Sequence, residues 1–229
     1  MSRNYGHYCG LARALDVVGD RWNLLIVRQL LMAPARYREL FEGLPGVATN
    51  LLADRLRDLE TAGVIERRLA EEGNAIVYAL TPWGAELREP VEGLIRWSTP
   101  LMTRGPGGDH FRAEWLVLPL SVLLTGKAAA RRSSTVGIAV DGVLVQVRMT
   151  RSGTEVSPHD GRDLDAVVRA DAPIVLGLAA GVLGLDDTRG LVEIEGDEAA
   201  VRAVFNPPPR RAPGAQRAEL DGRARSRRQ

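Results

Sequence analysis

The sequence predicts an α+β protein of two domains, and three features of the chain indicate this. Residues 49–62 have the leucine spacing of an amphipathic helix, and two short β-rich segments follow at 64–69 and 75–80. The segment 104–109 is rich in Gly and Pro and is typical of a linker. Asp141-Gly142 separates two β-rich runs, which is a strong signal for a hairpin. We therefore expect helices with a two-stranded hairpin first, and then a domain with a mainly antiparallel sheet.

Three helices are expected before residue 49. Apolar periodicity places them at 11–18, 21–32 and 36–43. Asp20 is a good residue to cap the start of the second helix. Phe41, with its neighbours Tyr37 and Leu40, is expected to point inward from the third.

The helix at 49–62 has two different faces. Its apolar stripe consists of Leu52, Leu56 and Leu59, and opposite that stripe lie Asn50, Asp54 and Arg57. In the major groove Asn can pair with adenine, Arg with guanine, and Asp can accept from cytosine. Such a polar face could equally be a solvated helix surface. A short Gly-containing turn before it and a hairpin after it are typical of a winged helix-turn-helix, which favours DNA reading.

These arguments give a set of candidate DNA contacts. Base reading is assigned to the polar face of the helix, and phosphate contact to its margin, to the start of the preceding helix and to the first strand of the hairpin. Arg67 and Arg68 are adjacent on that strand, so at most one of them faces DNA on the same side. The candidates are Arg36, Arg38, Thr49, Asn50, Asp54, Arg55, Arg57, Arg67 and Arg68.

Four segments of this domain resemble the HxlR family of bacterial winged-helix regulators. They are YCGLARALDVVGDRW (8–22), RYREL (36–40), LLADRLRDLE (51–60) and YALTPWG (78–84). The resemblance covers about residues 8–98 and implies a homodimer held by the first and last helices, with each subunit reading half of a near-palindromic operator. The sequence departs from the family at Ala48, where many members have Ser, so capping is expected to move to Thr49. The hairpin tip, 71–74, is acidic, which argues against deep insertion of the wing.

Cys9 stands immediately before the first predicted helix. Some members of the HxlR family sense electrophiles, quinones or aldehydes through a cysteine at this position, and such sensing requires a thiolate. The alternative is a small buried apolar side chain. With one cysteine in the chain, a switch would need a Cys9–Cys9 bond between subunits, a mixed disulfide or an adduct.

The last helix of the first domain is expected to open at Thr81-Pro82 and to run to about Ser98, where Thr99-Pro100 begins a break. Beyond the linker the order of elements is predicted from periodicity and turn signals. Asp197 is expected to cap a final helix that ends near Phe205. The other elements are a helix at 111–124, strands at 135–141, 143–149, 154–156 and 165–170, a helix at 172–180 and a strand at 192–195.

The second domain resembles the sterol carrier protein type 2 fold through DAVVRADAP (165–173) and GLVEIEGD (190–197). This resemblance covers about 110–206 and implies a curved sheet with helices on one side, enclosing an apolar tunnel for a lipid or another hydrophobic small molecule. The same residue types would also fill a solid core. Glycines in the helix near 174–185 could permit an opening or serve tight packing. Candidate wall residues are Val117, Leu120, Leu124, Leu176, Leu178, Leu183 and Leu185.

Composition excludes several classes of protein. The chain is 45% hydrophobic and 26% charged, as is ordinary for a soluble globular protein, and its apolar runs are too short to span a membrane. A single cysteine rules out an internal disulfide framework. The N-terminus lacks the apolar core of a signal peptide, so the cytoplasm is expected. No metal-ligand spacing, cofactor motif or catalytic constellation stands out, which argues against an enzyme.

Charge is unevenly distributed along the chain. Residues 1–105 carry 13 basic and 13 acidic side chains, residues 106–205 carry 10 and 14, and residues 206–229 carry 7 and 2. A neutral DNA reader is unusual because phosphate contacts supply much of the affinity. Local placement of arginines, or dimerisation, would have to compensate.

The sequence thus predicts a DNA-binding and dimerisation domain (1–103), a linker (104–109), a ligand-binding domain (110–206) and a basic disordered tail (207–229). Its expected partners are double-stranded DNA, a second copy of the chain and a hydrophobic effector, with no membrane. The alternative is a lipid- or small-molecule-binding protein whose helical domain serves mainly for dimerisation. Salt-dependent binding to duplex DNA distinguishes the two.

Overall fold

The computed structural model describes residues 4–70, 73, 75–102, 105–125 and 133–205. The chain divides into two compact units, Met1–Leu123 and Leu124–Gln229. Three of the four residues of the predicted hairpin tip, and all of the predicted C-terminal tail, lie outside the described residues.

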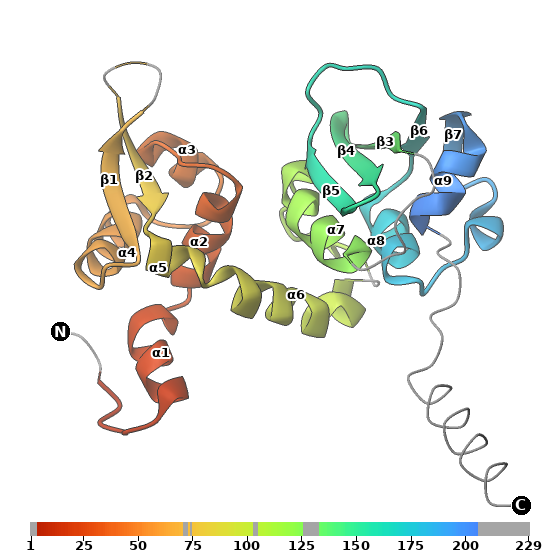
Figure 1. Ribbon diagram of the computed structural model, residues 1–229. Coiled ribbons are helices and arrows are strands. Elements are labelled where there is room, and N and C mark those ends of the chain that lie inside the picture. The colour runs from red at the N-terminus through yellow and green to blue at the C-terminus, as the bar shows by residue number, and fades with distance from the viewer. Residues whose placement is uncertain (1–3, 71–72, 74, 103–104, 126–132, 206–229) are drawn as a thin grey trace, which may run out of the picture. The chain divides into compact units, whose positions relative to one another are not determined.

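The first unit is helical apart from one hairpin (Figure 1). Its hairpin strands pair antiparallel, from Ile65 opposite Leu80 to Leu69 opposite Ile76. The elements are α1 (Gly10–Val18), α2 (Asn23–Met32), α3 (Tyr37–Glu42), α4 (Thr49–Thr61), β1 (Ile65–Leu69), β2 (Ile76–Leu80), α5 (Pro82–Ala85), α6 (Arg88–Met102), η1 (Ala113–Leu116) and α7 (Val117–Leu124).

The core of this unit forms where α4 meets α2 and α3. Leu52, Leu56 and Leu59 of α4 are fully buried and belong to one cluster with Ile26 of α2 and Leu40 of α3. Three leucines at spacings of four and three line one face of a helix, so burying this stripe fixes which side of α4 stays outside. The predicted amphipathic helix is confirmed.

The starts of α2 and α4 differ from prediction. Asp20 does not cap α2, which begins at Asn23 after Trp22 without a side-chain cap. The Asp20 carboxylate pairs instead with Arg55 of α4, a partner that sequence spacing does not reveal. Thr49 is not a cap either, because it is already the first residue of α4 and Ala48 occupies the N-cap position without a side-chain hydrogen bond.

Two further expectations for this unit are wrong. Phe41 does not point fully inward and is 36% exposed, whereas Leu40 beside it is buried. The expected break at Thr99-Pro100 is absent, because α6 continues through Pro100 to Met102. Pro100 has no backbone N–H to donate within the helix. Next to it, the Thr99 hydroxyl donates to the Ile95 carbonyl at 2.8 Å, which adds a hydrogen bond in the same turn.

The start of the C-terminal helical segment is predicted correctly. Thr81 caps α5 by accepting from the Gly84 N–H at 3.0 Å, and Pro82 occupies the first turn. The segment is divided, however, into the short α5 and the long α6. Within the described residues, none of the helices is both long and apolar enough to cross a membrane.

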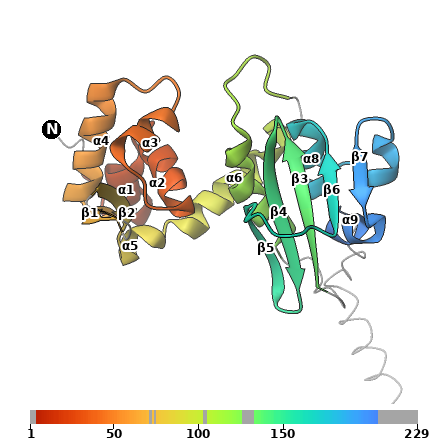
Figure 2. The same ribbon diagram turned by 90° about the horizontal axis from the view of Figure 1, so that it is seen from above.

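The second unit is built on a five-stranded sheet with the order β5-β4-β3-β6-β7 (Figure 2). Only β3 and β6 run parallel, so the predicted mainly antiparallel α+β arrangement agrees with the structure. Its elements are β3 (Ser134–Val140), β4 (Val143–Thr150), β5 (Gly153–Pro158), β6 (Ala166–Arg169), α8 (Ala172–Ala180), η2 (Leu185–Thr188), β7 (Glu193–Gly196) and α9 (Glu198–Phe205).

Turn chemistry and capping in this unit follow the sequence. Asp141 and Gly142 both have positive φ, 49° and 78°, as the tight β3–β4 hairpin requires. The Asp197 carboxylate accepts from the Ala199 N–H at 2.9 Å and caps α9. One face of the sheet is buried against helices, and Phe205 at the end of α9 is among the largest fully buried side chains.

Candidate nucleic-acid interface

The exposed face of α4 carries the three predicted base readers. Asn50, Asp54 and Arg57 are all exposed and lie opposite the buried leucines. Arg57 donates from Nη1 to Asp54 Oδ1 at 3.1 Å, and its side chain is 71% exposed. The face formed by these three residues therefore presents one amide, one carboxylate and one guanidinium to solvent, which are groups that can address base edges.

Several contacts hold the turn that leads into α4. The Tyr37 hydroxyl donates to the Thr49 carbonyl at 2.9 Å, which ties α3 to the first residue of α4. Gln29 of α2 donates to the Gly43 carbonyl at 3.3 Å, and a Cβ at position 43 would collide with that Gln29 side chain. Gly46 has φ of 85°, which favours glycine. The orientation of α4 is thus set by specific contacts from both preceding helices.

Arg55 lies apart from the three readers. Its side chain is only 20% exposed and forms ion pairs with Asp20 and, at 3.3 Å, with Asp58. The pair with Asp20 ties α4 to the turn between α1 and α2, whereas Asp58 lies on α4 itself. Arg55 therefore serves contacts within the protein in this structure.

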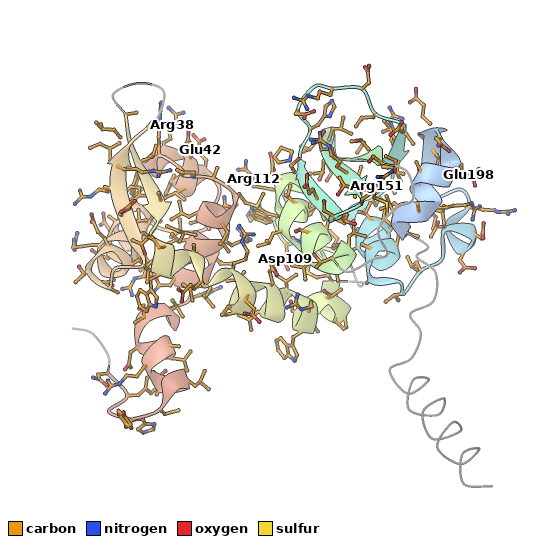
Figure 3. All side chains as sticks on the ribbon, in the orientation of Figure 1. Arg38, Glu42, Asp109, Arg112, Arg151 and Glu198 are labelled. Atoms are coloured by element: carbon orange, nitrogen blue, oxygen red, sulfur yellow. The ribbon has the colours of Figure 1, made fainter. Side chains whose placement is uncertain are left out.

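Arginines of α3 and β1 flank α4. Arg38 donates to Glu42 at 2.8 Å (Figure 3), and this pairing raises the pKa of Arg38. Arg67 on β1 donates to Glu60 of α4 at 2.8 Å, and the hydrogen bond with this carboxylate raises the pKa of Arg67. Both guanidinium groups are exposed and fully charged.

Two more candidates lie exposed near the same elements. Arg36 precedes α3, and its backbone N–H donates to the Glu39 carboxylate at 2.6 Å, leaving the side chain exposed. Arg68 is also exposed, opposite Val77 in the hairpin register, and projects to the other side of the hairpin from Arg67.

The carboxylates that pair with these arginines are the feature that sequence reasoning missed. Arg38–Glu42 has the (i, i+4) spacing and Asp54–Arg57 the (i, i+3) spacing of helix-surface pairs, so both could have been found from the sequence. The pair between Arg67 and Glu60 joins a strand to a helix and depends on the tertiary fold.

Cys9 is a free, exposed thiol at the N-cap of α1. In the single chain this exposure differs from the alternative of a small buried apolar side chain. The backbone N–H groups of Ala12 and Leu11, in the first turn of α1, lower the pKa of Cys9 because they favour the thiolate.

The candidate lipid-wall residues are packed. Gly177 faces Leu183 so closely that a Cβ would collide with the leucine side chain, so this glycine serves tight packing. Of the seven candidates, all except Leu183, which is partly buried, are buried: Val117, Leu120, Leu124, Leu176, Leu178 and Leu185. Among the described residues, no group of His, Cys, Asp and Glu side chains is arranged to hold a metal ion.

Comparison with known proteins relates the first unit to bacterial regulators. Residues 17–105 match the HxlR-like helix-turn-helix family. The chain is 34% identical over 86 residues to the HTH-type transcriptional regulator YodB of Bacillus subtilis, a match that covers 37% of this chain and 77% of that protein. The chain belongs to the HxlR family. The predicted family membership of the first domain is confirmed.

Two further matches cover a similar share of the chain. The chain is 36% identical over 84 residues to the uncharacterized HTH-type transcriptional regulator sll1512 of Synechocystis, covering 36% of this chain and 62% of that protein. A crystal structure of quinone-bound YodB from B. subtilis is 30% identical with a TM-score of 0.35, covering 39% of this chain and 96% of that one. The chain therefore spans less than two thirds of the Synechocystis relative.

Proposed function

We propose that this protein is a transcriptional regulator that binds duplex DNA as a homodimer and inserts α4 into the major groove of a near-palindromic operator. The observation that carries this proposal is the face of α4 formed by Asn50, Asp54 and Arg57, which is held outward by the buried leucines of the same helix. HxlR-family membership supports a DNA partner.

Phosphate contacts are assigned to the elements around α4. Arg36 and Arg38 at the start of α3, Thr49 at the start of α4, and Arg67 or Arg68 on the wing are the proposed contacts. Arg55 acts mainly by anchoring α4 to Asp20.

Selection of bound duplexes from a random-sequence pool tests this function. We expect enrichment of a motif with two related half-sites, and salt-dependent binding to it. A pool that shows no enrichment, with no binding to duplex DNA at low salt, would contradict the proposal and favour the lipid-binding alternative.

The dimer is proposed to form through α1 and α6, because both expose large apolar side chains. Tyr8 and Leu11 stand out at the start of α1, and Leu94, Trp97 and Leu101 stand out along α6. Trp97 is 76% exposed, which is costly for so large an apolar surface unless a partner covers it. The family resemblance implies that a second copy of the chain covers these side chains with the same two helices.

Trp97→Glu is expected to convert the dimer to a monomer. The fold should stay intact, because most of the Trp97 side chain lies outside the core. Light scattering after size-exclusion chromatography measures the mass. Leu191→Glu, at an exposed leucine of the second unit, is the matched control and should stay dimeric. Equal masses for both variants and the native protein would remove Trp97 from the interface.

Cys9 is proposed as a thiol sensor whose modification alters DNA binding. Its pKa is lowered, so the thiolate is populated at lower pH than in an ordinary cysteine, and alkylation should accelerate as pH rises through that lowered pKa. Iodoacetamide labelling rates followed by mass spectrometry measure this. Cys9→Ser should abolish the effect of quinone or oxidant treatment on duplex binding; an unchanged response in the variant would end this part of the proposal.

The second unit is proposed to be a sterol-carrier-like effector domain. The mixed sheet with packed helices is compatible with that fold, and the buried leucines would have to move to admit a ligand. An effector can change operator affinity only through different affinities for the competent and incompetent states. Native mass spectrometry should show a co-purified hydrophobic molecule; an unliganded protein that also fails to bind a fluorescent fatty acid would contradict the assignment.

A further inference from the structure

Two arginines among the candidate phosphate contacts are already paired with carboxylates. Arg38 binds Glu42 within α3 at 2.8 Å, and Arg67 on β1 binds Glu60 of α4 at 2.8 Å. Both arginine side chains are well exposed, so DNA can reach them. The two glutamates belong to neither the reading face nor the core.

We propose that Glu42 and Glu60 keep sequence-independent DNA binding weak by competing with phosphates for Arg38 and Arg67. This inference rests on the proposed function, since it concerns the same interface. The ligand is the phosphate backbone of duplex DNA, and the two glutamates set how strongly Arg38 and Arg67 attract it.

The charge balance of residues 1–105 supports this role. Residues 1–105 carry equal numbers of basic and acidic side chains, although phosphate attraction supplies essentially all of non-specific binding. A phosphate that contacts one of these arginines has to displace its glutamate, and breaking the existing ion pair offsets part of the free energy of the new contact. Each glutamate thus lowers the gain from a phosphate contact. The base-reading face then has to supply a larger share of the affinity.

Neutral variants of the two glutamates test the inference. Fluorescence anisotropy with a labelled random-sequence duplex gives the affinity of the full-length protein between about 50 mM and 200 mM salt. Glu42→Gln and Glu60→Gln should each raise this affinity roughly 2- to 5-fold, the range expected for one exposed pair. If each freed arginine gains a phosphate contact, the slope of log affinity against log salt should steepen by about 0.9 per contact.

A matched control separates local pairing from total charge. Glu195 in the second unit pairs with Arg169 at 2.9 Å, so Glu195→Gln changes the net charge equally and also frees an exposed arginine. It should bind like the native protein. In an Arg38→Ala background, Glu42→Gln should lose most of its gain, because the gain depends on the arginine that it frees. Thermal unfolding verifies that each variant is folded.

The outcomes distinguish a failure of the proposed DNA binding from a failure of the proposed role of Glu42 and Glu60. If the native protein and all variants bind neither the random duplex nor any pool-selected duplex, the proposed function fails and this inference fails with it. If the native protein binds a selected duplex but Glu42→Gln and Glu60→Gln behave like Glu195→Gln, only the role of the two glutamates is overturned. A gain from Glu42→Gln that persists in full without Arg38 overturns the pairing argument in the same way.

Discussion

Leu56→Ala is expected to lower the free energy of unfolding by about 2–5 kcal/mol. Leu56 is 1% exposed and packs in the cluster that joins α4 to α2 and α3. Truncation removes buried apolar surface and leaves a cavity that its rigid neighbours only partly fill. Urea unfolding followed by tryptophan fluorescence measures the change.

Thr61→Ala, at the exposed last residue of α4, serves as the control for Leu56→Ala and should stay within about 0.5 kcal/mol of the native protein. A loss below about 1 kcal/mol for Leu56→Ala would mean that α4 is not anchored as described. The stability effect also bears on function, because the same three leucines hold the reading face outward.

Arg57→Ala is expected to weaken binding to a selected duplex by about 1–3 kcal/mol and to relax specificity at one base position. Arg57 pairs with Asp54 at 3.1 Å, and the two side chains are 71% and 53% exposed, so the loss of Arg57 should change stability little. Binding would fall while the urea midpoint stays constant. That combination separates recognition from folding.

Arg169→Ala provides the matched control, because Arg169 is an exposed arginine paired with a glutamate in the second unit. It should leave the affinity and the preferred sequence unchanged. An Arg57→Ala variant that binds the selected duplex as the native protein does, with the same base preferences, would remove Arg57 from the reading set.

Local patterns in the sequence were sufficient for much of the fold. The leucine spacing predicted α4 because burial of one helix face needs only a period of 3.6 residues. Asp141-Gly142 and Asp197 predicted a turn and a cap because their chemistry acts over two or three residues. These features are decided by neighbours in the chain.

The errors arose where distant residues decide the outcome. Asp20 has a side chain that can cap a helix, but the tertiary fold brings Arg55 next to it. The Asp20 carboxylate forms an ion pair with Arg55 instead of capping α2. Pro100 usually ends a helix, yet α6 continues beyond it to Met102. Phe41 lies on a helix too short for periodicity to fix which side is buried.

In the candidate site, too, the sequence predicted the features that neighbouring residues decide and missed those that the tertiary fold decides. The polar face of α4 could be identified from the sequence, since exposure follows directly from the position of the leucines. The pairing of Arg67 with Glu60 could not, because it joins a strand to a helix seven residues away and depends on how the hairpin folds against α4. The charge count showed that residues 1–105 are neutral, and the structure identifies five carboxylates that pair with candidate arginines there, Asp20, Glu42, Asp54, Asp58 and Glu60.

The central claim is that two copies of α4 read the major groove of one duplex. Methylation protection of guanine N7 on a pool-selected duplex tests it most directly, because this atom faces the major groove. The account predicts two protected half-sites whose centres are separated by about one helical turn, or a multiple of it. Protection that is absent, or that appears at a single unrepeated site, would contradict it.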